Sequence, residues 1–188
     1  MRVDTTVVES NIHHPLDSNL LFDSVRVLTR LMKRASAELG SNHVPNRVRH
    51  AKRRALGILN ARTMEKRKPL YKDLVRVAEQ TIGRAHSVIA MLNRTIQRKK
   101  ANGEELTKLH AELTHYTGLA LRVVDQTRRR VFLGESVPAG DKLVSIFEEH
   151  TDVIVKDQRD TLYGYKICLS TGRFKSHFRL HSTRRTSG

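Results

Sequence analysis

The acidic residue Asp4 stands among apolar and β-branched neighbours near the start of the chain, in the stretch RVDTTVVE from Arg2 to Glu9. Val and Thr favour a β-strand. A carboxylate on such a strand is costly unless it is paired, exposed at a sheet edge or bound to a metal ion. In nucleases and strand-transfer enzymes, several such carboxylates hold two Mg²⁺ ions that activate the attacking oxygen and stabilise the leaving one. Asp4 is therefore a candidate catalytic residue and metal ligand.

Basic side chains crowd one region, where nine Lys and Arg residues lie between Arg47 and Lys68 beside the single acid Glu65. Phosphate contacts need a dense cationic face, and arginine can grip phosphate oxygens through two hydrogen bonds. The candidate nucleic-acid-binding residues are Arg47, Arg49, Lys52, Arg53, Arg54, Lys66, Arg67 and Lys68. Smaller clusters occupy 98–100 and 128–130. The alternative is a merely solvated basic face.

Histidine and cysteine offer weaker signals. In HAELTH, His110 and His115 are five residues apart and do not match the zinc-protease spacing. The pair His13 and His14 precedes a proline and is typical of a turn. The single cysteine, Cys168, lies between apolar residues and excludes a disulfide within the chain. We therefore expect no cysteine-rich zinc site.

Charge dominates the composition of the 188 residues, because 35 Lys and Arg against 19 Asp and Glu leave a net charge of +16. Such a surplus favours a polyanionic partner, with nucleic acid first. With no Trp and 5% aromatic residues, base stacking on single strands has little support. No apolar run is long enough for a membrane span and the start is unlike a signal peptide. We expect a soluble, cytoplasmic protein with no membrane partner.

Helical periodicity runs from Leu20 to about Leu133 and predicts four helices. The first is expected to be capped by Asp17 or Ser18 and to end at Gly40. The others are expected at about 45–63, at about 69–100 and from the turn at 101–103 onward. In the second helix Val48, Ala51, Ala55 and Leu59 are expected to face inward. The third and fourth helices are long and closely joined, which predicts an antiparallel helical hairpin.

Short β-rich segments lie on both sides of this helical region. Strands are expected at 2–9, at 143–147 (LVSIF), at 153–155 and at 165–169 (YKICL). The first strand should pair with the later ones, because a lone strand leaves its backbone groups unsatisfied. The segment from Arg173 onward shows neither periodicity and is predicted to be disordered or foreign to the fold.

Two separated stretches carry a family resemblance. RVDTTVVESNIHHPLDSNLLFDSVRVLTR near the start and KLVSIFEEHTDVIVKDQRDTLYGYKICLSTG downstream closely resemble bacterial insertion-sequence transposases of the DDE type, from Arg2 to about Gly172. The resemblance implies an α+β fold: a partial ribonuclease-H-like sheet with a large helical insertion that contains the long hairpin. It also implies DNA cleavage and strand transfer with Mg²⁺ and three carboxylates, of which Asp4 matches the first.

The resemblance implies this domain organisation: first core strand at 1–14, helical insertion at 15–140, further core strands at 141–172 and basic tail at 173–188. The second catalytic Asp and the catalytic Glu of the family would lie beyond the point where the likeness ends. Asp152, Asp157 and Asp160 precede that point and are not assigned to the site. Glu149 replaces the usual Pro of the family's FEPHTD stretch.

These departures predict a transposase truncated at both ends, with an internal start and a frameshifted tail. We expect it to be inactive alone, since one carboxylate cannot position two metal ions. A second hypothesis is a DNA-binding regulator that forms homo-oligomers or mixed oligomers with an intact transposase. A third treats the helical hairpin as a protein-interaction module without nucleic acid. Weak salt dependence of binding would favour this third hypothesis, because phosphate-dominated binding weakens steeply as salt rises.

Overall fold

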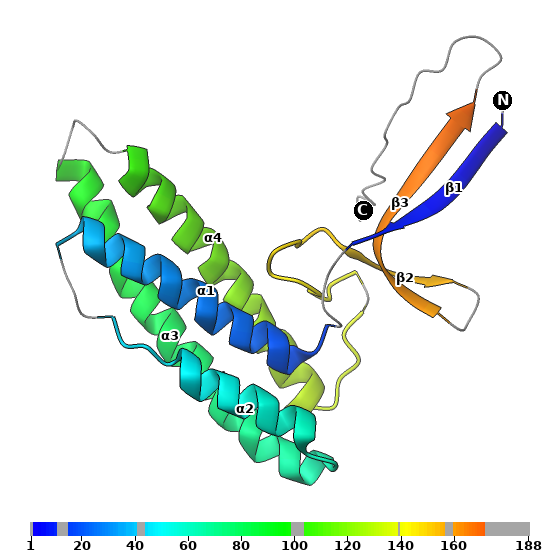
Figure 1. Ribbon diagram of the computed structural model, residues 1–188, viewed down its shortest axis with the longest axis horizontal. Helices are drawn as coiled ribbons and strands as arrows, with labels where there is room; N and C mark the ends of the chain where they lie inside the picture. Colours follow the sequence, from blue (N-terminus) through cyan, green and yellow to red (C-terminus); the bar gives the residue numbers. More distant parts are fainter. Residues whose placement is uncertain are drawn as a thin grey trace. The chain divides into compact units, whose positions relative to one another are not determined.

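The chain folds into a helical unit and a sheet unit, seen here in a computed structural model (Figure 1). The structure describes residues 2–10, 15–40, 44–98, 104–138, 140–156 and 160–171. The helical unit spans Pro15–Pro138, and the sheet unit combines Met1–His14 with Ala139–Gly188. The expected basic tail at 173–188 and the histidine pair at 13–14 lie outside the described residues.

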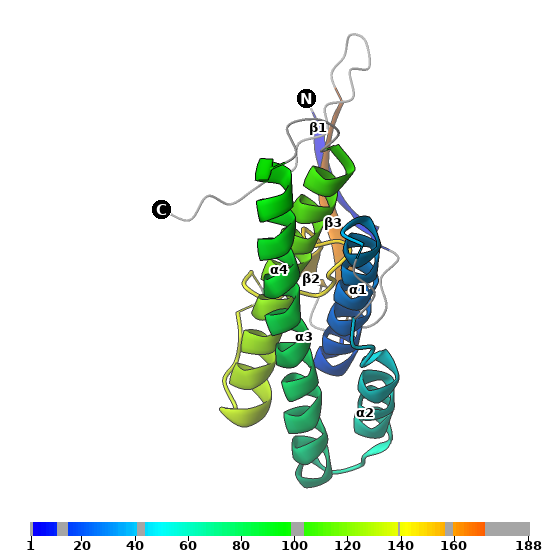
Figure 2. The same ribbon diagram turned by 90° about the vertical axis from the view of Figure 1, so that its left-hand side faces the viewer.

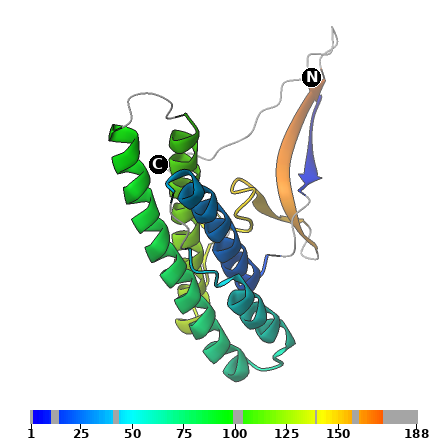
Figure 3. The same cartoon turned by 60° about the vertical axis from the view of Figure 1, so that its left-hand side comes forward.

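The helical unit contains α1 (Asp17–Glu38), α2 (Val48–Asn60), α3 (Met64–Arg98) and α4 (Glu104–Thr127), and α4 continues into the π-helix η1 (Arg128–Phe132). Helices α1, α3 and α4 pack against one another, while α2 packs against α1 and α3 (Figure 2). The antiparallel hairpin predicted from the sequence is α3 and α4, which lie side by side in Figures 1 and 3. Fully buried leucines fill the centre, among them Leu21, Leu28, Leu74, Leu92, Leu109 and Leu113.

The start of α1 differs from the sequence prediction. Leu16 occupies the N-cap position, without a side-chain cap, so neither Asp17 nor Ser18 caps the helix. Asp17 lies in the first turn, where a negative charge is favourable beside the exposed N–H groups. At the other end, Gly40 follows α1 with φ +69°, a left-handed conformation that glycine adopts without steric cost, so this stop is confirmed.

The buried carboxylate of Asp17 joins the first turn of α1 to the end of α4 and to η1. Gln126 Nε2 donates to Asp17 Oδ1 at 2.9 Å, and Arg130 Nη1 donates to Asp17 Oδ2 at 2.7 Å. The Asp17 side chain is only 6% exposed, so these partners offset a large desolvation cost. Burial, followed by the negative charge of Asp17, raises the pKa of the nearby Tyr71 hydroxyl. The residues at which the chain enters and leaves the helical unit are thus tied together.

The sheet unit contains three antiparallel strands in the order β1-β3-β2. Strand β1 (Arg2–Glu9) pairs along its whole length with β3 (Asp160–Thr171), and β3 also pairs with β2 (Asp152–Lys156). The predicted pairing of the first strand with a late strand is confirmed. Strand β3 is longer than the predicted 165–169, because its two ends pair with different neighbours.

The segment LVSIF at 143–147 is not a strand, contrary to the sequence prediction. Ser145 Oγ accepts hydrogen bonds from the backbone N–H of Phe147 at 3.1 Å and of Glu148 at 3.2 Å. A serine hydroxyl that bonds the following backbone amides makes a local turn, which competes with a sheet ladder. Leu143, Val144 and Ile146 are nevertheless buried, so the apolar run reflects burial rather than strand pairing.

The expected fold class was wrong. No ribonuclease-H-like sheet is seen in the described part of the chain, which is mostly helical and whose only sheet has three antiparallel strands. The resemblance covers the two stretches that form this sheet, but they pair there as a three-stranded antiparallel ladder with β3 in the middle. The observed class is therefore a helical unit with a small antiparallel sheet.

A helix that crosses a bilayer must be both long and apolar. No helix in the described part of the chain combines the length and the apolar composition that crossing a membrane requires. The exposed sides of the helices are instead rich in charged groups, as on α2 and the first half of α3.

Replacing Asp17 tests the tie between α1 and η1. We expect Asp17→Ala to lower the free energy of unfolding by roughly 2 to 3 kcal/mol, because Gln126 and Arg130 lose a shared charged acceptor. Urea denaturation followed by circular dichroism measures this. The control is Glu79→Ala, which removes an exposed ion pair with Arg128 and should cost less than about 1 kcal/mol. Equal effects of the two changes would contradict the role assigned to Asp17.

Candidate nucleic-acid interface

Helix α2 carries four of the eight predicted basic residues, and it begins with a local hydrogen bond. Asn46 Oδ1 accepts from the backbone N–H of Val48 at 3.2 Å, which satisfies one of the free amides at the helix start. Ala51, Ala55 and Ile58 are buried. Near the end of α2, a Cβ added to Gly57 would lie 3.3 Å from Leu70 Cδ1, so α2 and α3 approach closely there.

The connection between α2 and α3 is held by one of the predicted basic residues. Arg67 Nε donates to the carbonyl oxygen of Ala61 at 2.8 Å, and the Arg67 backbone N–H donates to the Thr63 carbonyl oxygen at 3.1 Å. Arg67 is half-buried, and its guanidinium stabilises the turn between α2 and α3 through this hydrogen bond. Its neighbours Lys66 and Lys68 remain exposed.

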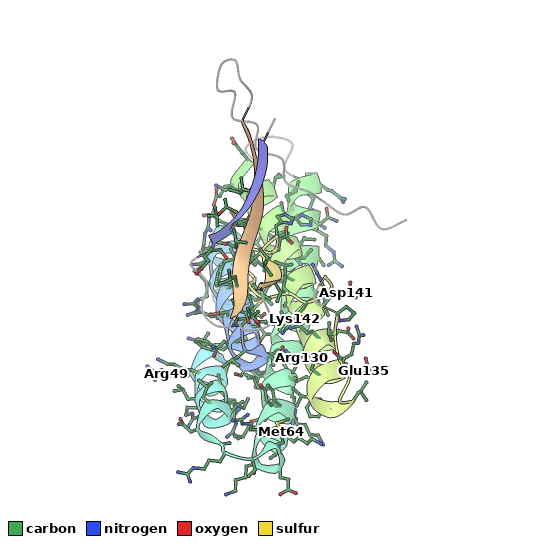
Figure 4. The ribbon with its side chains drawn as sticks, turned by 90° about the vertical axis from the view of Figure 1, so that its right-hand side faces the viewer. Arg49, Met64, Arg130, Glu135, Asp141 and Lys142 are labelled. Carbon is green, nitrogen blue, oxygen red and sulfur yellow. The ribbon has the colours of Figure 1, made fainter. Side chains whose placement is uncertain are left out.

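The outward side of α2 presents unpaired cations. Arg49, Lys52 and Arg53 are exposed and share one side of the helix, because Lys52 and Arg53 follow Arg49 by three and four residues. None of the three forms an ion pair within the described residues. Arg47, at the N-cap position, is also exposed. Figure 4 shows Arg49 pointing away from the helix into open space.

Arg54, in contrast, faces α3 and is engaged there. Asp73 Oδ2 accepts a hydrogen bond from Arg54 Nε and lies 2.9 Å from His50 Nε2. The hydrogen bond with His50, together with Arg54, lowers the pKa of Asp73 below its ordinary value of 3.8. This bridge joins α2 to α3 and acts together with the burial of Ala51, Ala55 and Ile58 to orient α2. Arg54 is therefore better described as a residue that positions the exposed cations than as a phosphate contact.

In the cluster at 128–130, all three arginines form ion pairs. Arg128 pairs with Glu79, Arg129 with Glu135 and Arg130 with Asp17. The run of three arginines in η1 therefore connects α1, α3 and the segment after η1, and much of its charge is neutralised within the fold. Of the cluster at 98–100, only Arg98 lies among the described residues, and it is exposed.

A basic row on α3 was missed by sequence reasoning. Lys68, Lys72 and Arg76 are exposed, four residues apart, and make no ion pair in the part of the chain that the structure describes. The row extends beyond the dense run that ended at Lys68, so a count of consecutive charges did not reveal it. Helical spacing within the third predicted helix was the signal that could have found it.

The predicted metal ligand Asp4 lies in the middle of β1, with Leu169 of β3 as its partner. The described side chains do not include that of Asp4. They contain no group of three or more His, Cys, Asp or Glu residues that could hold a metal ion. His110 and His115 both lie on α4, where His115 packs edge-on against Tyr116. The side chain of Cys168 is also outside those described.

Comparison with known proteins gives no assignment. The chain matches no protein-family model, no curated protein and no solved structure.

The bridge at Asp73 should make stability depend on acid. Because the folded pKa of Asp73 is lowered, its stabilising effect is present above 3.8 and is lost as the pH falls through the lower folded value. We expect the free energy of unfolding to drop more steeply below about pH 4 in the unmodified protein than in Asp73→Asn. Urea denaturation at several pH values measures this. His50→Ala should reduce the slope in the same direction, and identical slopes in all three proteins would contradict the bridge.

Proposed function

We propose that this protein binds the phosphate backbone of DNA through the exposed cations of α2 and the basic row of α3. The observation that carries the proposal is the contrast between paired and unpaired arginines. The fold engages Arg54 and the run at 128–130 in ion pairs, whereas Arg49, Lys52 and Arg53 have no such partner among the described residues. Crowding unpaired cations is unfavourable unless a polyanion compensates them.

The resemblance to DDE transposases supports the same partner independently. It rests on the two sequence stretches around β1 and β2–β3, and it gives Asp4 the place of a Mg²⁺-binding carboxylate. The two further carboxylates of that chemistry have no match in this sequence, and a single one cannot hold two metal ions. We therefore propose DNA binding without strand transfer, in a protein related to transposases.

Salt dependence tests phosphate binding. For a random-sequence duplex, log K should fall steeply with log salt concentration between about 50 and about 200 mM, and each of Arg49→Ala, Lys52→Ala and Arg53→Ala should reduce that slope by about 1. Fluorescence anisotropy with a labelled duplex measures the affinity. Lys108→Ala is a matched control, because Lys108 is an exposed cation on α4 that forms no ion pair with any of the described residues.

Binding that is insensitive to salt, or an equal effect of Lys108→Ala, would overturn the assignment of the interface to α2. Salt-insensitive binding to another protein would instead favour the interaction module.

A second experiment addresses catalysis. Incubation of the protein with DNA and Mg²⁺ should give no cleavage or joining product on a sequencing gel. Asp4→Asn should bind DNA with unchanged affinity, because Asp4 lies on β1 and the cations proposed to bind DNA lie on α2 and α3. Mg²⁺-dependent cleavage that disappears in Asp4→Asn would show that the chain catalyses strand transfer, and would contradict this part of the proposal.

A further inference from the structure

Two leucines on α2 are exposed although the helix has an apolar side for the core. Leu56 is 48% exposed and Leu59 is 45% exposed. Leu59 was predicted to face inward, but Ile58 occupies the core position instead. Ile58 and Leu59 follow Ala55 by three and four residues, so helical spacing alone allows either of them to face the core. An exposed leucine is unremarkable singly, but a pair on one face of a basic helix needs a reason.

The leucines lie on the same side of α2 as the unpaired cations. Leu56 follows Lys52 and Arg53 by four and three residues, and Leu59 follows Leu56 by three. The outward side of α2 thus combines positive charge in its first half with apolar surface in its second. We call this set, Arg49, Lys52, Arg53, Leu56 and Leu59, the α2 surface.

The dimensions and location of α2 suit a groove of duplex DNA. Its 13 residues give a helix about 20 Å long, and the major groove admits an α-helix. Helix α2 packs against α1 and α3 on its buried side only, and Figure 3 shows it at the margin of the helical unit. The Asp73 bridge with His50 and Arg54 helps to orient α2, so the α2 surface stays turned away from the core.

The chemistry of the α2 surface matches that groove. Phosphates line both rims of the major groove and attract Arg and Lys, while the floor exposes the C5-methyl group of thymine, which favours apolar contacts. An acidic protein would also attract the cations in the first half of this surface, but it would give no difference between thymine and uracil duplexes, which the experiment below measures. Duplex DNA accounts for both kinds of residue.

Resting on the DNA binding proposed above, we propose that α2 enters the major groove. Leu56 and Leu59 contact base edges, with the methyl group of thymine as the preferred target, and Arg49, Lys52 and Arg53 contact the flanking phosphates. The leucines give a preference for thymine-containing sites, and the cations give the salt dependence.

Replacing thymine by uracil isolates the methyl contact. We would measure the affinity of the full chain for two duplexes of the same A·T-rich sequence, one with deoxythymidine and one with deoxyuridine, which lacks only the C5-methyl group. We expect tighter binding to the thymine duplex, by about fourfold for each methyl group buried. The double variant Leu56→Ala, Leu59→Ala should bind both duplexes equally and keep the salt slope of the unmodified protein.

Matched controls keep the outcomes apart. Leu121→Ala removes a leucine of similar exposure, 46%, from α4 and should retain the thymine preference. Leu56→Gln, which keeps helix propensity, should lose part of it. Equal affinity of the unmodified protein for the two duplexes, with salt-dependent binding intact, would overturn groove insertion while leaving phosphate binding in place. Loss of salt dependence would overturn both.

Discussion

The carboxylate of Asp17 is the interaction on which the helical unit depends. It lies in the first turn of α1 and accepts hydrogen bonds from Gln126 on α4 and Arg130 on η1, so one group fixes the start of the first helix against the end of the last. The hairpin of α3 and α4 packs against α1 largely through apolar side chains, whose burial has no directional preference. A buried charge with two defined donors specifies one register, because any other leaves it unsatisfied.

The sequence predicted those parts of the fold that follow from periodicity. The four helices, the α3–α4 hairpin and the pairing of β1 with a late strand are all present. Prediction failed where a side chain competes with the backbone or where two positions fit equally well. Ser145 turns the chain within LVSIF, and Ile58 takes the core position expected for Leu59. The ribonuclease-H-like sheet was expected from the family resemblance alone, and this expectation was wrong because the observed sheet has three antiparallel strands in the described residues.

The sequence predicted the basic residues of the candidate site, but it did not predict which of them form ion pairs within the fold. A run of arginines reads as uniform, because the acid that engages each of them is distant in sequence. Asp73 is 19 residues from Arg54, and Glu79 is 49 from Arg128. Only the packing of α2 on α3 separates Arg54 and Arg67, which hold the helices in place, from Arg53 and its exposed neighbours. The structural arginines thereby orient the ones that remain available to a phosphate.

The pairing of β1 with β3 has a consequence for how the protein comes to be folded. Arg2 is the partner of Thr171, so β1, which precedes the helical unit in the sequence, pairs with a strand that follows it. Contacts of such long sequence separation form slowly, because closing the intervening loop costs entropy. Folding of the helical unit shortens that loop, since Asp17 and Arg130 bring its two ends together. The helices therefore favour sheet assembly by bringing β1 and β3 closer together, and a nascent chain carries β1 without its partner until β3 has been synthesised.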